Sequence, residues 1–195
     1  MIQLRKLTDT PIEPELLDLA MSHLRITNDA EGSLLSQYLA AARAYFERMT
    51  GRVLLTQTYE LSLSDWPTSG YIQLGRNPIA SIESVEYVDR DDATQTVSAA
   101  DYVLFQPEDA SGIVSFRDSF TEPEASDRID AITVSFTAGS TSLAGVPFDQ
   151  RQALLFLTAH LYELRTPINV GNIVNEIPLS LNSIITMNKI GGFVA

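Results

Sequence analysis

The spacing of apolar residues divides the chain into two helical stretches, a β-rich stretch between them and an apolar tail. From Leu16 to Leu24, and again from residue 34 to 49, apolar side chains recur at intervals of one, three and four, which predicts amphipathic helices. Gly51 follows the second stretch as a natural helix C-cap. A further helix is predicted over residues 147–166. It is apolar nearly all round, so we expect it to be buried on more than one side.

Between these helices the pattern changes to that of β-strands. A hairpin turn is predicted at residues 89–92, and residues 117–128, rich in Asp, Glu, Ser and Pro, are expected to form a mobile loop. Short strands with frequent turns predict a small antiparallel sandwich or barrel. The strands are predicted at residues 53–63, 71–74, 82–88, 102–105, 112–116 and 129–136.

The predicted fold class is therefore α+β. Two N-terminal helices and the helix near residues 147–166 are expected to form a small helical bundle, with the β domain inserted and an extended C-terminal tail. The expected parts are residues 1–52 (N-terminal helices), 53–138 (β domain), 139–166 (third helix) and 167–195 (tail).

The tail is apolar, carries only two charges and shows no long regular period. Ordering a chain costs about 1–2 kcal/mol per residue, so such a segment needs a surface to lie on. We expect it to dock on another protein or subunit, and removal of residues 176–195 to leave the fold intact; the alternative is that it packs on its own domain. The candidate docking residues are Ile173, Ile177, Leu179, Leu181, Ile184, Ile185, Met187 and Phe193.

Charge is concentrated in the β domain. The chain has 25 acidic and 13 basic residues, a net charge of −12, and residues 53–138 alone hold −11. This disfavours sequence-independent binding of nucleic acid, which needs an excess of Lys and Arg. No apolar run is long enough for a membrane span, and the absence of cysteine excludes disulfides and thiolate chemistry.

Candidates for chemistry are few. His160 and Glu163 share a helical face, but no second ligand pair accompanies them. The acids at residues 89–92 lack the glycine and the closing glutamate of a calcium loop. Trp66 and the tyrosines could line a sugar-binding face, although a β core needs aromatic residues as well. No nucleophile or nucleotide-binding motif is present, so no catalytic, metal-binding or cofactor-binding residue is predicted.

The order of several short runs resembles the head–tail connector (adaptor) proteins of long-tailed bacteriophages and gene-transfer agents. The most recognisable run has the form A-A-R-x-x-x-E-x-x-T-G-R-x-L, from Ala41 to Leu54. Ser140 and Leu164 depart from the family's usual residues. The other runs are LLDLAMSHLRI at residues 16–26, the strand pair at 77–89, ITVSFTAG at 132–139 and the helix from Pro147 to Arg165.

The resemblance implies a non-enzymatic virion protein without cofactors. Such adaptors form a ring, commonly twelvefold, under the portal vertex. The ring extends the DNA channel, through which DNA passes without specific binding, and gives neck (stopper) or tail-completion proteins a platform. The acids of the β domain would then form either a solvated outer face or a negative surface near the channel that repels DNA. The helices are expected to form the ring, the β insertion to project from it, and the tail to reach the portal or a neighbouring subunit. The ring-interface helix would use Leu154, Leu157, Leu161, Tyr162 and Arg165.

The implied location is the head–tail junction of the virion, after a period in the host cytoplasm, with no membrane contact. Three alternatives stay open at this point. The chain could be another neck or tail-completion protein, a carbohydrate-binding β domain carried by helices, or a small DNA-binding packaging subunit, which the charge disfavours.

Overall fold

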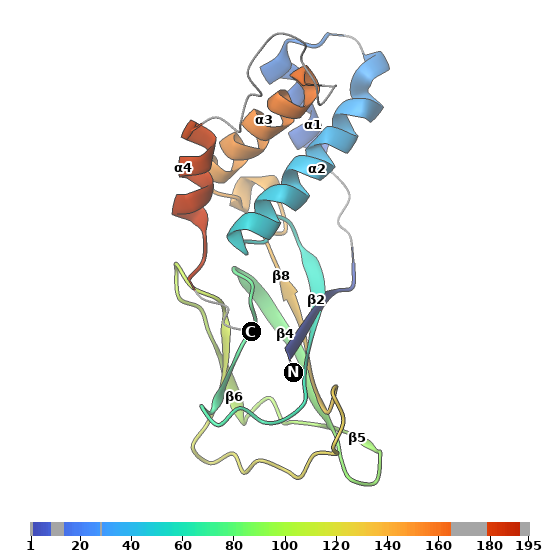
Figure 1. Cartoon of the computed structure of the whole chain (residues 1–195), viewed down its shortest axis with the longest axis vertical. Coiled ribbons are helices and arrows are strands. Elements are labelled where there is room, and N and C mark those ends of the chain that lie inside the picture. The colour runs from blue at the N-terminus through green and yellow to red at the C-terminus, as the bar shows by residue number, and fades with distance from the viewer. Residues whose placement is uncertain (1, 9–13, 28, 165–178, 192–195) are drawn as a thin grey trace. The chain divides into compact units, whose positions relative to one another are not determined.

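The computed structural model describes residues 2–8, 14–27, 29–164 and 179–191 (Figure 1). The chain divides into two compact units. The helical unit comprises residues 11–54 and 141–189, and the β unit comprises residues 1–10, 55–140 and 190–195. Helices and antiparallel sheets are thus both present, which confirms the α+β class.

The helical unit is built around α2, whose apolar stripe faces α1, α3 and α4. Leu35, Leu39 and Phe46 of α2 are fully buried, together with Leu16 of α1 and Leu154 of α3. Their spacing of four and seven residues along α2 places them on one face. The elements are α1 (Pro14–Leu24), η1 (Asp29–Glu31), α2 (Gly32–Thr50), η2 (Leu143–Gly145), α3 (Phe148–Glu163) and α4 (Leu179–Asn188).

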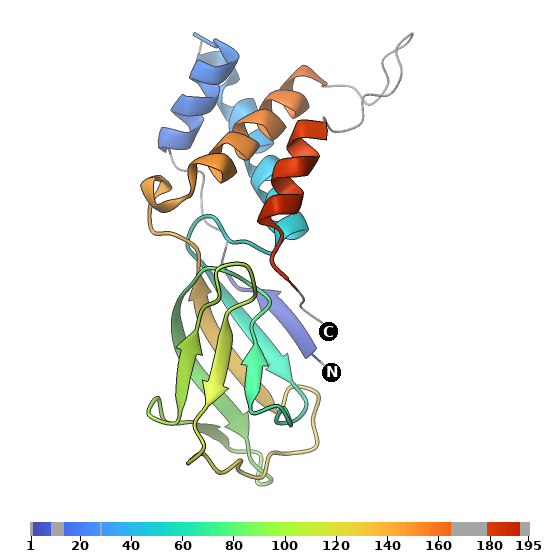
Figure 2. The ribbon, with the colours of Figure 1, turned by 90° about the vertical axis from the view of Figure 1, so that its left-hand side faces the viewer.

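The β unit contains two sheets, which Figure 2 shows as separate layers. The five-stranded sheet has the order β1-β2-β8-β4-β5, and the three-stranded sheet has the order β3-β7-β6. All pairs are antiparallel. The strands are β1 (Ile2–Lys6), β2 (Gln57–Leu63), β3 (Tyr71–Gln73), β4 (Ile79–Val88), β5 (Thr94–Thr96), β6 (Tyr102–Phe105), β7 (Ile113–Phe116) and β8 (Ile132–Ala138).

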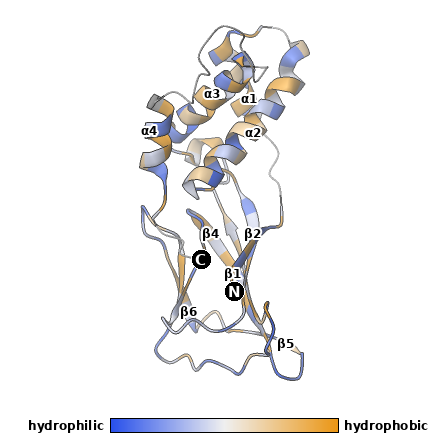
Figure 3. Ribbon diagram, in the orientation of Figure 1, coloured by the Kyte–Doolittle hydropathy of each residue, from blue (hydrophilic) through white to orange (hydrophobic). Residues whose placement is uncertain are grey.

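The centre of the five-stranded sheet follows strict alternation. In both β2 and β8 every second residue is buried, as expected for strands with one core face. Tyr59 is paired with Phe136, and their rings are stacked at 5.5 Å. Leu61 is paired with Val134 in the same core layer. Figure 3 shows the hydrophilic colouring of the loops near β5, in contrast to these inner strands.

Trp66 joins the two sheets at one end of the β unit. Its ring lies 5.9 Å from Tyr87 of β4 and 5.5 Å from Phe116 of β7. Its indole Nε1 donates a hydrogen bond to the carbonyl of Pro123 at 2.9 Å. Among the described strands the two sheets share no pairing, so they do not close into a barrel.

Two predictions about the termini are wrong. Residues 1–52 were assigned to the helices, whereas Ile2–Lys6 form β1 and pair with β2. The tail was expected to be extended, whereas Leu179–Asn188 form α4. The short β5 was also not predicted. No helix among the described residues is long and apolar enough to cross a membrane.

Candidate interaction surfaces

The run that most resembles the connector family forms the end of α2. Gly51 takes the left-handed conformation, with φ of 76°, and its N–H donates to the Glu47 carbonyl at 2.9 Å. The Thr50 hydroxyl accepts the N–H of Arg52 at 3.1 Å. The buried carboxylate of Glu47 accepts the N–H of Leu54 at 3.0 Å. These residues therefore satisfy the backbone donors where the chain leaves the helix.

Asn188, the last residue of α4, connects three helices. Its backbone carbonyl accepts a hydrogen bond from Arg52 Nε at 2.8 Å, just beyond α2. Its side chain accepts from Gln150 Nε2 at 2.8 Å and donates to Asp149 Oδ2 at 2.7 Å, both in the first turn of α3. Asn188 and Gln150 are buried. We call these four residues the Asn188 junction. Because buried polar groups are expensive to leave unpaired, the junction fixes α4 against α2 and α3.

The predicted docking residues of the tail differ in burial once α4 has formed. Leu181 and Ile185 are buried inside the chain, as the alternative of packing on its own domain requires. Ile184 is half-buried, whereas Met187 is 81% exposed. Leu179 begins α4. The remaining candidates, Ile173, Ile177 and Phe193, lie outside the described residues.

The predicted ring-interface residues of α3 are also divided. Leu154 and Leu157 are buried in the core of the helical unit. Leu161 and Tyr162 are half-buried, and the Tyr162 hydroxyl donates to the carboxylate of Glu31. Arg165 lies outside the described residues.

A small apolar surface on α1 and α3 was not predicted. The ring of His23 meets the ring of Phe156 edge-on, with centroids 5.9 Å apart. Leu19 lies one turn before His23 on α1, and Leu19 and Phe156 are 42% and 39% exposed. We call these three residues the α1–α3 patch. The sequence signal was present, since the helix at 147–166 is apolar nearly all round, but it does not identify which residue stays outside.

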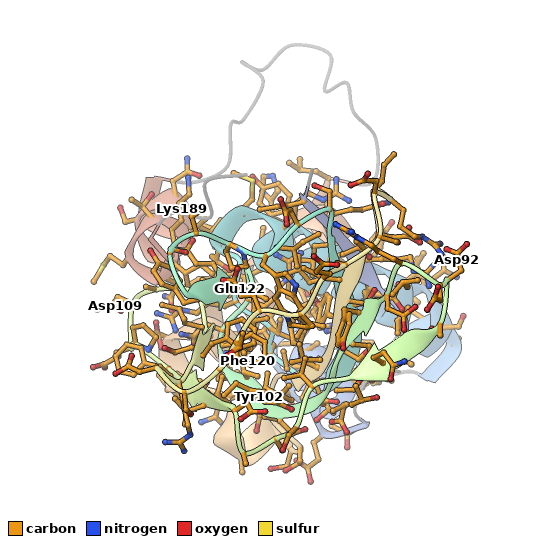
Figure 4. All side chains as sticks on the ribbon, turned by 90° about the horizontal axis from the view of Figure 1, so that it is seen from below. Asp92, Tyr102, Asp109, Phe120, Glu122 and Lys189 are labelled. Atoms are coloured by element: carbon orange, nitrogen blue, oxygen red, sulfur yellow. The ribbon has the colours of Figure 1, made fainter. Side chains whose placement is uncertain are left out.

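One end of the β unit is strongly acidic. The ends of β2, β4 and β7 and the starts of β6 and β8 lie together there, because these strands are paired antiparallel and Trp66 joins the sheets. Figure 4 looks at this end, with Asp92 at the rim and Phe120 and Glu122 near the middle. We call it the acidic end; its acids are Asp65, Asp89, Asp91, Asp92, Asp101, Asp118, Glu122, Glu124, Asp127 and Asp130.

Local hydrogen bonds hold two of these acids in the charged form. The Gln95 side chain and the Ala93 N–H, at 2.9 and 3.0 Å, lower the pKa of Asp89. Arg128, whose Nε lies 2.8 Å from Asp130, lowers the pKa of that carboxyl. Asp89 therefore stabilises the hairpin turn, and its oxygens are already engaged by the protein.

The other candidates for chemistry do not assemble into a site. Trp66 is only 8% exposed and belongs to the aromatic cluster, so it offers no open platform for a sugar. His160 is half-buried and Glu163 is exposed on α3. Among the described residues, no group of three His, Cys, Asp or Glu side chains is placed to hold a metal ion.

Comparison with known proteins gives a consistent result. Among the solved structures, a chain in "Neck of empty GTA particle computed with C6 symmetry" is 25% identical, with a TM-score of 0.80 and 99% of this chain and 98% of that chain covered. A chain in "Virion of native gene transfer agent (GTA) particle" is 24% identical, with a TM-score of 0.80 and 98% and 97% covered. A chain in "Neck of native GTA particle computed with C12 symmetry" is 24% identical, with a TM-score of 0.75 and 99% and 98% covered.

A search of the curated proteins gave no match. The family described as "Phage gp6-like head-tail connector protein" matches residues 15–132, which cover α1 from its second residue, α2, strands β2 to β7 and the first residue of β8. This match spans more than half of the chain and contains the run that ends α2. The chain therefore belongs to the phage head–tail connector family and has the role of a structural connector, or adaptor.

Proposed function

We propose that this chain is a non-enzymatic connector that forms a ring, with twelve copies as the expected number, under the portal vertex of a phage or gene-transfer particle. The ring would extend the DNA channel and join the portal to a neck (stopper) or tail-completion protein. Before assembly the chain would be in the host cytoplasm. The observation that carries the proposal is the match of nearly the whole chain to a protein in the neck of a gene-transfer particle.

Two further observations support a structural role without catalysis. The matched necks were computed with sixfold and twelvefold symmetry, as a ring of repeated subunits would allow. Gln150 and Asn188, two buried polar residues of the helical unit, are hydrogen-bonded to each other and so serve the fold.

The charge of the β unit is consistent with DNA passing without being held. The acidic end has few bases, and two of them are paired with acids: Arg90 with Glu124 at 3.2 Å and Arg128 with Asp130 at 2.8 Å. A surface of this kind repels phosphate. We favour a solvated outer face for the acidic end over a position in the channel, since its ion pairs are exposed.

We propose that the helical unit, taken as a small bundle with the β unit as an inserted sandwich, supplies one set of subunit contacts. Leu161, Tyr162 and Arg165 of the ring-interface helix would contact a neighbour, supported from within by the buried Leu154 and Leu157. The α1–α3 patch would add a second surface, because a closed ring needs two different surfaces on each subunit.

The tail would contact the portal or a neighbouring subunit through the candidates that the core does not use. Met187 is the strongest of these among the described residues, because it is 81% exposed. Ile173, Ile177 and Phe193 would contribute from the same tail. Leu181 and Ile185 would hold α4 in place instead.

The experiment is to mix the purified protein with the portal protein of the same genome and image the complexes by negative stain. We expect a ring of added density on one face of the portal. A Met187→Asp variant should reduce its occupancy, and Thr186→Asp, an exposed neighbour on α4, is the matched control. Unchanged portal particles at saturating protein would contradict the proposal.

A second candidate function is another neck or tail-completion protein of the same particle. The matched structures favour it as the runner-up, because they are those of a particle neck and of a virion. Binding to a purified neck protein but not to the portal would favour this alternative.

A further inference from the structure

The β unit has two open sides that differ from one another. β1 and β3 are edge strands of the two sheets, and β5 and β6 are the opposite edges. Figure 2 shows β1 and β3 on one side of the unit and β6 on the other. We call these the pocket side and the knob side. Exposed strand edges are sites where other chains can add, unless the protein blocks them.

The pocket side contains a hollow between the two edge strands. A pocket of about 360 Å³ is lined by Ile2 of β1, Leu63 of β2, and Tyr71 and Ile72 of β3. Ile2 and Tyr71 are 40% and 39% exposed, so the rim of the pocket is apolar as well. The hollow is therefore large enough and apolar enough to receive a hydrophobic side chain.

The knob side presents such side chains. Residues of β6 alternate, with Tyr102 and Leu104 half-buried and Val103 and Phe105 exposed. Val103 is 41% exposed and Phe105 59% exposed. Both lie on the outer face of the three-stranded sheet at its β6 edge, the face that Tyr71 occupies at the β3 edge. Such a pair of exposed apolar side chains forms a small patch that a partner can cover.

The charges of the two sides are complementary. β1 carries two bases that interact within the chain and remain exposed: Arg5, which is ion-paired with Glu60 at 3.2 Å and has a 64% exposed side chain, and Lys6. On the knob side Asp101 directly precedes β6, and Glu108 and Asp109 follow it. A basic edge facing an acidic edge favours one orientation of two copies over the others.

We propose that the β units of adjacent copies bind each other, with Phe105 and Val103 of one copy entering the pocket between β1 and β3 of the next. The inference rests on the proposed ring. Because the two sides are different surfaces, the contact is head-to-tail and repeats by rotation, as a closed ring requires; a twofold dimer would pair one surface with itself.

The lack of cysteine makes the contact directly testable by crosslinking. Ser69→Cys marks the pocket side, since Ser69 lines the pocket and is exposed, and Val103→Cys marks the knob side. The two full-length variants are mixed with the portal protein and treated with a short bismaleimide. We expect several-fold more crosslinked dimer from this mixture than from either variant alone or from Ser69→Cys with Ser119→Cys, which is exposed at the acidic end. Equal crosslinking of all pairs would overturn the inference.

A second variant checks the knob itself. Phe105→Glu, added to the Val103→Cys chain, should abolish the crosslink while the thermal unfolding curve stays that of a folded protein. Ile129→Glu is the matched control, because Ile129 is 61% exposed but lies on neither side. Rings on the portal without the specific crosslink would reject this contact and leave the connector role standing. The specific crosslink without binding to the portal would support this contact and reject the connector role.

Discussion

The helical unit and the β unit differ most in where they keep their charges. The helical unit has nine acidic and seven basic residues, whereas the β unit has sixteen and six. In the helical unit, the charged Arg43 and Glu47 are buried within the packing of the helices, as are the neutral amides of Gln150 and Asn188. In the β unit the ion pairs lie on the surface, as with Arg128 and Asp130, whose side chains are 45% and 53% exposed.

This difference has a consequence for stability. Exposed ion pairs contribute little to folding, so the β unit depends on its apolar sheets and tight turns. The helical unit depends on α4, which adds the buried Leu181 and Ile185 and completes the Asn188 junction. Trp66, the only tryptophan, lies in the β unit, so its fluorescence reports that unit while helical circular dichroism reports mainly the other.

The largest effect is expected from removing residues 176–195. The helical unit would lose the buried side chains of Leu181 and Ile185, and also Asn188, which is hydrogen-bonded to Arg52 and Gln150. We expect these losses to destabilise the unit by about 5 kcal/mol or more. This reverses the expectation drawn from sequence that the fold survives. Chemical denaturation followed by circular dichroism at the helical band should show the loss.

Two point variants on α4 separate packing from chain length. Leu181→Asp should reproduce much of the loss, because that side chain is 1% exposed, whereas Met187→Asp at 81% exposure should not. If the helical signal of the truncated chain were lost at the same denaturant concentration as that of the wild type, α4 would be dispensable for stability.

A large effect confined to the β unit is expected from Gly139→Ala. Gly139 has φ of +95°, and an added Cβ would lie 2.4 Å from the carbonyl oxygen of Leu55. Backbone strain and overlap each cost about 1–3 kcal/mol, so we expect a loss of about 3 kcal/mol in the transition seen by Trp66 fluorescence. Gly70→Ala is the matched control in the same unit, because Gly70 also has a positive φ, +72°, but nothing lies within 4 Å of its added Cβ. An equal loss of stability in the two variants would contradict the overlap with Leu55.

A smaller effect in the helical unit is expected from Asn188→Ala. It leaves Gln150 and Asp149 without this partner, and one or two unsatisfied buried groups cost about 2 kcal/mol. The helical transition should shift while Trp66 fluorescence does not. Thr186→Ala, on the exposed face of α4, should change neither the helical transition nor the Trp66 transition. A shift as large as that of Asn188→Ala would argue against the Asn188 junction.

The smallest effect concerns pH and the β4–β5 hairpin. The pKa of Asp89 is lowered in the folded chain, so its contribution to stability is present above about pH 4 and is lost as the pH falls through the folded pKa. Asp89→Asn should therefore lower the Trp66 transition slightly at pH 7 and flatten its decline in acid. Glu122→Gln removes the same charge from the acidic end without touching the hairpin, and an identical pH profile for the two would refute the role of Asp89.

The sequence predicted the elements that have a core face. The spacing within α2 follows its buried Leu35, Leu39 and Phe46, and β6 was predicted with the bounds observed. β1 and β5 were missed because these two edge strands bury almost nothing that could impose a pattern: in β1 only Leu4 is half-buried, and β5 is exposed throughout.

A break in the apolar pattern explains why an extended tail was predicted where α4 forms. Its buried positions are Leu181, Ile185 and Asn188, at helical spacing, but the third is polar and interrupts the apolar period. The hydrogen-bond partners of Asn188, Arg52 and Gln150, lie far from it in the sequence. The connector family could be inferred from the run that ends α2, whereas the pocket and the exposed Phe105 require the paired strands to be in place.

The central claim is that copies of this chain form a ring at the head–tail junction. The most direct test is a cryo-electron microscopy map of the neck of the particle whose genes include the gene for this chain. We predict a ring of density directly below the portal into which this fold fits once per subunit, α1 to α4 and both sheets included. A neck whose portal-proximal ring is built by a different chain would contradict the account.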